Sequence, residues 1–225
     1  MLSQSTEDYL KAILEREAGH GAASTTGIAR ILRVSPASVT GMLKRLGRAG
    51  LVQHVPYRGA SLTATGRRVA LRVVRRHRVL ETYLAAKLGY GWDSVHAEAE
   101  RLEHAVSDEL VERMAMALGE PRYDPHGTPI PTAAGLVESL QGTPLADVSA
   151  GELAKLLRVS GRDPELLRYV ASLGLRPGVR FEVAARQPFR GPVTIRVLGP
   201  PVREHAIGGE LATRLLCEVV PREAG

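Results

Sequence analysis

The sequence predicts a mainly α-helical protein with small β elements, divided into three units. Two short helices followed by a β-hairpin are predicted near the N-terminus, and long apolar repeats at helical spacing follow them. Toward the C-terminus, short apolar runs alternate with Gly/Pro turns, which is typical of a small β-barrel. We therefore expect a winged helix-turn-helix over residues 1–72, a helical unit over 73–145 and a β unit over 146–225.

The first predicted helix covers the stretch "STEDYLKAILEREAG". Ser5 is the expected N-cap, acidic residues follow it at the positive end of the helix, and Gly19 is the expected end. Apolar residues at helical spacing form one stripe, and Asp8 lies near the edge of that stripe. This helix can therefore bury one face and still present Asp8 at a border.

A helix-turn-helix follows the first helix. We expect a short helix from Thr25 or Thr26 to Leu32, a tight turn, and a second helix that opens at Ser35 with Pro36 in its first position. The stretch "LVQHVPYRGASLTATGRR" reads as two short strands with residues 57–59 at the hairpin tip. Helix, turn, helix and hairpin in this order predict a winged helix-turn-helix.

The charge distribution favours nucleic acid as the partner of this unit. Residues 1–80 carry a balance of +10 and residues 81–225 a balance of −4, and residues 18–80 contain twelve basic side chains and no acidic one. A polyanionic partner compensates such self-repulsion. The alternatives are an arginine-rich composition bias and a winged helix that pairs with protein.

In double-stranded DNA the second helix would enter the major groove, where its N-terminal residues reach base edges. Short hydroxyl side chains suit that approach, and basic side chains meet phosphates. The base-edge candidates are Ser35, Ser38 and Thr40. The phosphate candidates are Lys44, Arg45 and Arg58, and Thr26, Pro36 and Tyr57 complete the expected DNA-binding set.

Imidazole and carboxylate side chains gather in the helical unit. His77 and Glu81 are four residues apart on a long helix that leaves the wing. After a break at "GYGW", one further helix is expected over "HAEAERLEHAVSDELVERMAMAL". Offsets of four, seven and eight from the first histidine place four side chains on one face of it: His96, Glu100, Glu103 and His104. The alternative is an ordinary solvated helix face.

These ligand types without thiolate suit manganese or iron(II), and zinc or nickel less exclusively. Cys217 is the only cysteine, so a cysteine-based zinc site and an internal disulfide are excluded, and we expect it to be buried. A turn-rich loop with prolines at 121, 125, 129 and 131 follows the helices. The last unit begins with a strand-like or helical segment and a helix over about 164–172.

Several motifs occur in one order along the chain: "TEDYL", "SPASVTGMLKRLGRAGLV", "RRHRVLE", "HAEAERLEH", "SDE" and "DPHGTPIP". Together they resemble the diphtheria-toxin-repressor family of metalloregulators, which control iron or manganese homeostasis. The resemblance covers the whole chain and implies that the C-terminal β unit is SH3-like. It also implies a homodimer that binds a palindromic operator once a metal co-repressor is bound between the DNA-binding and dimerisation units.

Carried over by motif, the resemblance implies a first metal site at Asp8, His77, Glu100, Glu103 and His104. It implies a second site at Glu81 and His96, with Asp124, His126 and Asp163 as further candidates. The iron-responsive branch has methionine at the position of Asp8 and cysteine at that of Glu100, so Mn(II) is favoured over Fe(II). The small manganese regulators have glutamate where Lys11 stands, and because a protonated lysine cannot ligate, we expect two separate ions per subunit.

The expected function is therefore a metal-dependent transcriptional regulator, not an enzyme. Two other functions remain as alternatives: a winged-helix regulator that senses a small organic ligand, and a metal-dependent hydrolase. The N-terminus lacks the basic-then-apolar layout of a signal peptide, and the chain has no apolar run long enough to span a membrane. We expect a cytoplasmic protein without a membrane partner.

Overall fold

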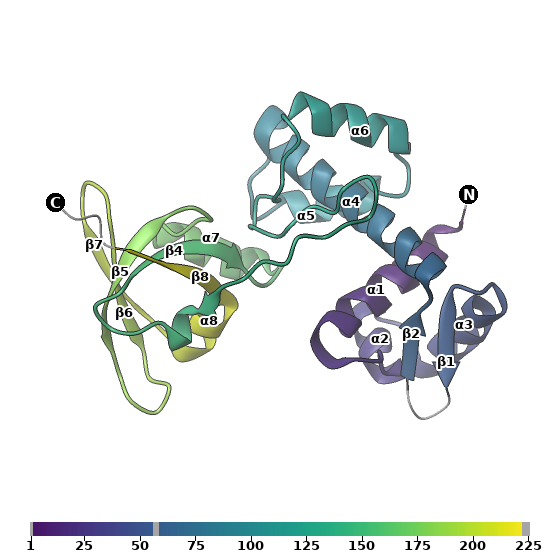
Figure 1. Cartoon of the computed structure of the whole chain (residues 1–225), viewed down its shortest axis with the longest axis horizontal. Helices are drawn as coiled ribbons and strands as arrows, with labels where there is room; N and C mark the ends of the chain where they lie inside the picture. Colours follow the sequence, from purple (N-terminus) through teal and green to yellow (C-terminus); the bar gives the residue numbers. More distant parts are fainter. Residues whose placement is uncertain (1, 56–58, 222–225) are drawn as a thin grey trace.

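The computed structural model describes residues 2–55 and 59–221, and within them the chain forms the three expected kinds of unit. Figure 1 shows the winged helix and the helical unit joined by one long helix, with the C-terminal β unit to the other side at the end of an extended connection. None of the helices in the described part of the chain combines the length and the apolar character that a membrane span needs.

The N-terminal unit is a winged helix-turn-helix, as predicted. Its elements are α1 (Gln4–His20), α2 (Thr25–Leu32), α3 (Pro36–Arg48), β1 (Val52–Val55) and β2 (Gly59–Leu62). The prediction of Ser5 as the cap of α1 was wrong: the Ser3 side chain accepts the Thr6 N–H, so Ser5 lies inside the first turn. The helix ends at His20 rather than at Gly19.

The two helices of the helix-turn-helix begin with serine caps. Ser24 accepts the Gly27 N–H before α2, and Ser35 accepts the Ser38 N–H before α3, where Pro36 occupies the first position as expected. Arg33 ends α2 in the left-handed conformation and makes the tight turn. Apolar side chains from α1, α2, α3 and the hairpin pack into one core.

The hairpin is antiparallel, with Val52 opposite Leu62 and Val55 opposite Gly59. The predicted tip residues Tyr57 and Arg58 lie outside the described residues. The long helix α4 (Ala64–Leu88) begins directly after β2, capped by Thr63. It runs without a break across the expected unit boundary at residue 72, so the N-terminal and helical units share one helix.

The helical unit consists of α4, α5 (Val95–Leu102) and α6 (Asp108–Ala117). The prediction of a single helix from His96 onward was wrong, because Ser107 caps α6 by accepting the Leu110 N–H and the chain turns between residues 103 and 107. The stripe of four ligand-type side chains is therefore divided: His96 and Glu100 lie on α5, whereas Glu103 and His104 lie in the turn that follows.

The predicted loop after the helices has neither helix nor strand from residue 118 to residue 142. Asp124 organises its first part by accepting the backbone N–H groups of His126 and Thr128. Pro-rich sequence and Asx-type turns thus hold the loop in one path over the helical unit.

The C-terminal unit is a six-stranded antiparallel sheet with the strand order β3-β8-β4-β5-β6-β7. Its elements are β3 (Thr143–Pro144), η1 (Leu145–Asp147), β4 (Leu153–Val159), α7 (Pro164–Ser172), β5 (Arg180–Arg186), β6 (Val193–Val197), β7 (Arg203–Ile207), α8 (Gly209–Arg214) and β8 (Leu215–Val220). The predicted helix over 164–172 is confirmed. Cys217 is buried, as expected, and burial raises the pKa of its thiol to about 12.

The C-terminal unit contacts the helical unit through the loop. Val159 donates its N–H to the His126 carbonyl, and Trp92, from the α4–α5 connection, joins the apolar core of the C-terminal unit. A Cβ added at Gly127 would lie 1.9 Å from the Leu157 carbonyl oxygen, and Gly127 has φ +84°, so only glycine fits this approach. The sheet is thereby held beside the polar cluster of α4.

Candidate metal centre and nucleic-acid interface

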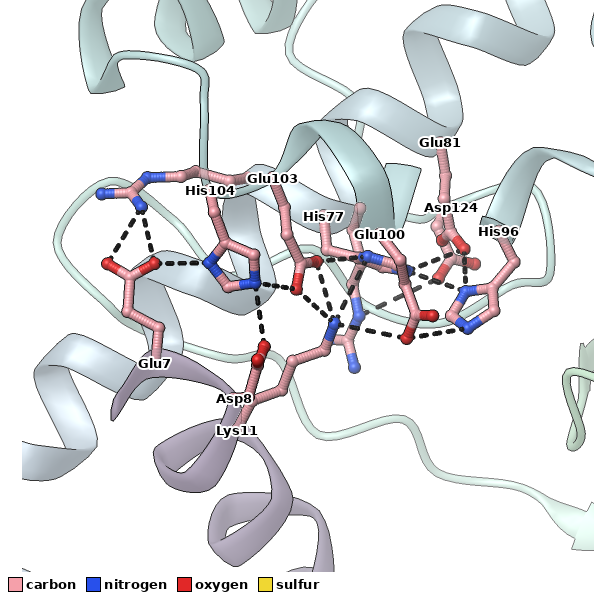
Figure 2. Close-up of polar contacts among 12 residues, drawn as sticks. Glu7, Asp8, Lys11, His77, Glu81, His96, Glu100, Glu103, His104 and Asp124 are labelled. Atoms are coloured by element: carbon pink, nitrogen blue, oxygen red, sulfur yellow. Dashed lines mark hydrogen bonds and ion pairs between the residues drawn. The ribbon is translucent and has the colours of Figure 1, made fainter. Parts of the chain in front are cut away.

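Polar side chains from four segments converge where α1, α4 and α5 meet (Figure 2). Three groups of three residues bring one ligand-type atom each to within 4.8 Å of the others. The α1 group is Asp8, Glu103 and His104; the α4 group is His77, Glu81 and His96; the loop group is Glu81, Asp124 and His126. All three contain carboxylate oxygen and imidazole nitrogen only.

The α1 group joins the winged helix to the helical unit. His104 Nε2 lies 2.9 Å from Asp8 Oδ1 and 3.3 Å from Glu103 Oε1. Asp8 comes from the first turns of α1, whereas Glu103 and His104 come from the turn after α5. A cation held by this group would therefore bind both units at once.

The α4 group lies directly beside the α1 group. His77 Nε2 is 2.9 Å from Glu81 Oε1 and 2.9 Å from His96 Nδ1, because His77 and Glu81 are one turn apart on α4 and His96 faces them from α5. The second nitrogen of His77 donates to Glu103 Oε2 at 2.5 Å. His77 thus connects the α4 group to the α1 group.

The loop group uses the other oxygen of Glu81. His126 Nδ1 lies 4.0 Å from Glu81 Oε2, while His126 Nε2 donates to the Trp92 carbonyl at 2.7 Å. That bond leaves the Nδ1 lone pair toward the carboxylates, which is the arrangement of a metal-binding histidine. A cavity of about 200 Å³ opens beside this group, lined in part by Arg78, Asp124 and Arg162.

Lys11 lies inside the cluster. Its ammonium donates to both carboxylate oxygens of Glu103 at 2.8 Å, and it lies 3.4 Å from His77 Nδ1 and 4.0 Å from Glu100 Oε1. Figure 2 shows this side chain reaching up from α1 between Glu103 and Glu100. A side-chain cation therefore already pairs with a carboxylate that a metal ion would use.

Burial and neighbouring charges shift several pKa values. Burial raises the pKa of Asp8, and burial together with the charge of Glu81 raises that of Asp124. The hydrogen bond with His96 lowers the pKa of Glu100 to about 2. Burial raises the pKa of Glu103, but the hydrogen bond from His77 and the charge of Lys11 outweigh it, so the net shift is downward.

The α1 and α4 groups suit a divalent ion of intermediate hardness. Their donors are buried or half-buried, have no thiolate among them, and include carboxylates whose charges need compensation in a desolvated place. Manganese(II) and iron(II) accept this donor set, as do zinc and nickel.

Most of the predicted ligand residues converge, with two exceptions among the described residues. Glu100 is half-exposed, with Oε1 3.4 Å from His96 Nε2, and does not join any of the three groups. Asp163 does not reach them either, because its carboxylate caps α7 by accepting the Glu165 N–H. The neighbouring Arg162 extends toward the cavity instead and pairs with Glu15 of α1 at 2.6 Å.

Two further residues contact the cluster without having been predicted from the sequence: the acidic Glu7 and the basic Arg76. Glu7 Oε2 accepts a hydrogen bond from His104 Nδ1 at 2.7 Å, and Arg76 lies 3.3 Å from the same carboxylate. Glu7 precedes Asp8 in α1, and its position in the sequence indicates only an acidic residue in the first turn of a helix. Since 97 positions separate Glu7 from His104, no local pattern reveals this contact.

The expected DNA-contacting side chains form an exposed face on α2 and α3. Thr26, Ser35, Pro36, Ser38 and Lys44 are exposed. The exposed face near the start of α3 carries small side chains. A Cβ added at Gly41 would meet nothing within 4 Å, so the space beside the helix backbone there is open. The wall of a DNA groove can therefore approach the backbone closely. Thr40 is half-buried, and its hydroxyl donates a hydrogen bond to the Pro36 carbonyl. The hydroxyl oxygen can still accept a hydrogen bond, but its proton is already used.

Arg45 differs from the other basic candidates. Its guanidinium donates to Thr6 Oγ1 at 3.3 Å, across from α3 to the first turn of α1. Thr6 is buried and stands two residues before Asp8. This contact ties the expected recognition helix to the segment that carries Asp8 of the α1 group.

Three family models match successive parts of the chain. A model of the iron-dependent repressor N-terminal DNA-binding domain matches residues 1–60, one of the iron-dependent repressor metal-binding and dimerisation domain matches 63–132, and the FeoA domain model matches 143–219. These matches follow the order of the three units in the structure.

Curated relatives and solved structures agree with the domain matches. The chain is 34% identical over 163 residues to the iron-dependent repressor of Mycobacterium leprae, covering 72% of this chain and 69% of that protein. It is 32% identical over 196 residues to the diphtheria toxin repressor of Corynebacterium efficiens, covering 83% and 85%. A solved manganese-dependent transcriptional repressor in complex with manganese superposes with a TM-score of 0.88 at 38% identity, covering 96% of this chain and 100% of that one.

Proposed function

Because this chain belongs to the diphtheria-toxin-repressor family of iron- and manganese-dependent transcriptional repressors, we propose that it is a repressor whose binding to a palindromic operator depends on Mn(II). It acts in the cytoplasm as a homodimer, and two ions per subunit bind at the cluster of α1, α4 and α5. The family models for a DNA-binding domain and for a metal-binding and dimerisation domain match this chain in that order.

The observation that carries the proposal is the composition of the α1 group. Asp8 belongs to the winged helix, whereas Glu103 and His104 belong to the helical unit. A divalent ion supplies a positive charge that can be shared by ligands from both units. With an ion bound, these three residues hold α1 against the turn after α5. All three can reach the ion together only in one relative arrangement of the winged helix and the helical unit.

The arrangement of α1 is passed to the recognition helix through Arg45 and Thr6. In a dimer, the two α3 helices bind adjacent major grooves only if they are about 34 Å apart, one helical turn of DNA. Metal increases operator affinity only as far as it binds this arrangement better than the others. Asp8 and Arg45 thus connect metal binding to the spacing of the two helices.

Manganese is favoured over iron because the donors are carboxylate oxygens and imidazole nitrogens only, without the softer methionine and cysteine that the iron-responsive branch has at the positions of Asp8 and Glu100. The similar solved repressor that carries manganese supports the same choice. We propose one ion at the α1 group and one that uses Glu81, since Glu81 belongs to both the α4 group and the loop group and those two groups compete for it.

The test is manganese titration of operator binding by Glu103→Gln and His104→Gln. The duplex is selected from a random pool by the manganese-loaded wild-type protein, and affinity is measured at fixed salt because phosphate contacts make it salt-dependent. Both variants are expected to lose metal-dependent binding and to remain dimeric in analytical ultracentrifugation. Glu98→Gln on α5, outside the three groups, is the matched control and should behave as wild type.

Unchanged metal dependence in both variants would contradict the assignment of the α1 group. Tighter operator binding with iron(II) than with manganese(II), both added anaerobically, would contradict the choice of metal. Counting ions by anomalous scattering at the manganese edge tests the expected two ions per subunit.

A further inference from the structure

The two ring nitrogens of His104 face different carboxylates. Nε2 points to Asp8 Oδ1 at 2.9 Å and to Glu103 Oε1 at 3.3 Å, both members of the α1 group. Nδ1 lies 2.7 Å from Glu7 Oε2, and Glu7 is not a member of any group. Figure 2 shows the ring standing between Glu7 on one side and Asp8 and Glu103 on the other.

A neutral imidazole has one N–H donor and one lone pair, and the bond made by one nitrogen decides what the other can do. When Nδ1 donates its N–H to Glu7, the lone pair is on Nε2, which faces the remaining carboxylates. A carboxylate on the outer nitrogen also makes a ligating imidazole more basic and holds its ring in one orientation.

We propose that Glu7 is a positioning residue of the metal centre, which holds His104 so that Nε2 is the atom offered to the ion. Glu7 acts through His104 and does not itself ligate. Glu7 is buried, with 12% of its side chain exposed, so water competes little for the bond to Nδ1.

Arg76 fixes the carboxylate of Glu7 in turn. Its Nη1 lies 3.3 Å from Glu7 Oε1 and 3.4 Å from Oε2, and its Nε donates to Asp108 Oδ1 at 2.8 Å. Arg76 is on α4 and Asp108 is the first residue of α6. Glu7 is therefore held by the helical unit although it is a residue of α1.

The same contact adds to the connection between the two units. Glu7 and Asp8 are adjacent on α1, and they hold opposite nitrogens of one side chain from the turn after α5. This consequence for operator binding rests on the proposed function. The effect of Glu7 on metal binding does not, because it is measured without DNA.

The first experiment uses the full-length wild-type protein loaded with zinc(II), a diamagnetic probe, and long-range ¹H–¹⁵N NMR of histidine side chains. His104 is assigned by its loss in His104→Gln. We expect its Nε2 to show the shift of a metal-bound nitrogen and its Nδ1 to carry a hydrogen-bonded proton. A metal-bound Nδ1 would overturn the proposal, and this result needs no variant at Glu7.

The second experiment measures manganese(II) affinity by electron paramagnetic resonance of the free ion. Glu7→Gln keeps the shape of the side chain and is expected to weaken binding at the α1 group by about 10- to 100-fold, and to shift the Nδ1 proton resonance of the zinc form. Asp108→Asn is the matched control, because it removes the other carboxylate of Arg76 and leaves the contact between Glu7 and His104; we expect it to change affinity by less than about threefold.

If Glu7→Gln and Asp108→Asn lost manganese(II) affinity equally, the affinity would depend on the ion pairs of Arg76 and not on the orientation of His104. That result would overturn the proposal. An unchanged affinity in Glu7→Gln would also overturn it. If operator binding by the wild-type protein did not depend on metal, the proposed function would fail while both metal-binding results could still stand.

Discussion

Replacing Lys11 with methionine tests whether this lysine competes with the metal ion. Lys11 donates to both oxygens of Glu103 at 2.8 Å, and both side chains are buried. At an effective dielectric constant of about 20, two unit charges at that distance attract by about 6 kcal/mol before desolvation is subtracted. Removing one partner of a buried ion pair usually costs about 3–5 kcal/mol, because the other charge stays uncompensated.

We therefore expect Lys11→Met to lower the thermal unfolding temperature of the metal-free protein and to bind manganese(II) more tightly. If about half of a 4 kcal/mol loss is recovered when an ion compensates Glu103, the gain of about 2 kcal/mol corresponds to roughly 30-fold tighter binding. Titration monitored by electron paramagnetic resonance measures the affinity, and thermal unfolding with a chelator measures the stability of the metal-free form.

Lys87→Met is the matched control, because Lys87 is exposed in the last turn of α4 and should change neither quantity. A Lys11→Met variant that is destabilised without metal and yet binds manganese no more tightly than wild type would refute the reasoning. It would show that the ammonium of Lys11 and the ion do not compete for the same carboxylate.

Three further predictions concern other parts of the molecule. The hydrogen bond with His96 lowers the pKa of Glu100 from 4.5 to about 2, so the ionised Glu100 stabilises the metal-free fold above pH 4.5. In thermal unfolding with a chelator, the difference in unfolding temperature between wild type and Glu100→Gln should therefore vanish as the pH falls from 4.5 to 2. Gly127→Ala places a Cβ 1.9 Å from a carbonyl oxygen and should destabilise the protein by more than about 2 kcal/mol in denaturant titration, whereas Gly119→Ala, with φ +75° and open space, should cost about 1–2 kcal/mol. Lys44→Gln should reduce the slope of log affinity for operator DNA against log salt by about one, and an unchanged slope would exclude a phosphate contact.

The sequence predicted the local structure well wherever the signals were local. Ser35 followed by Pro36 marked the start of α3, and the structure confirms that helix and the hairpin after it. The one large error was the helix through Glu103 and His104, although Ser107 followed by two acids is a cap signal and could have been used. The apolar repeat continued across the break and concealed it.

For the site, spacing along α4 predicted that His77 and Glu81 share one face, and motif resemblance supplied the other candidate ligands. Neither source indicated how α1 meets the turn after α5. The contacts of Glu7 with His104 and of Lys11 with Glu103 join positions 97 and 92 residues apart. They depend on the packing of α1 against α4 and on the end of α5 at Leu102.

The sequence by itself determined the winged helix, the basic charge of the N-terminal unit, and a donor set of imidazole and carboxylate without thiolate. These properties depend on residue type and on short-range spacing, and both are the same whatever the tertiary structure of the chain. Only the tertiary structure decided which nitrogen of His104 faces Asp8 and Glu103, that the ammonium of Lys11 lies beside them, and that Asp163 caps a helix. Those outcomes depend on distances between segments far apart in the chain, and side-chain packing fixes such distances only once α1, α4 and α5 have come together.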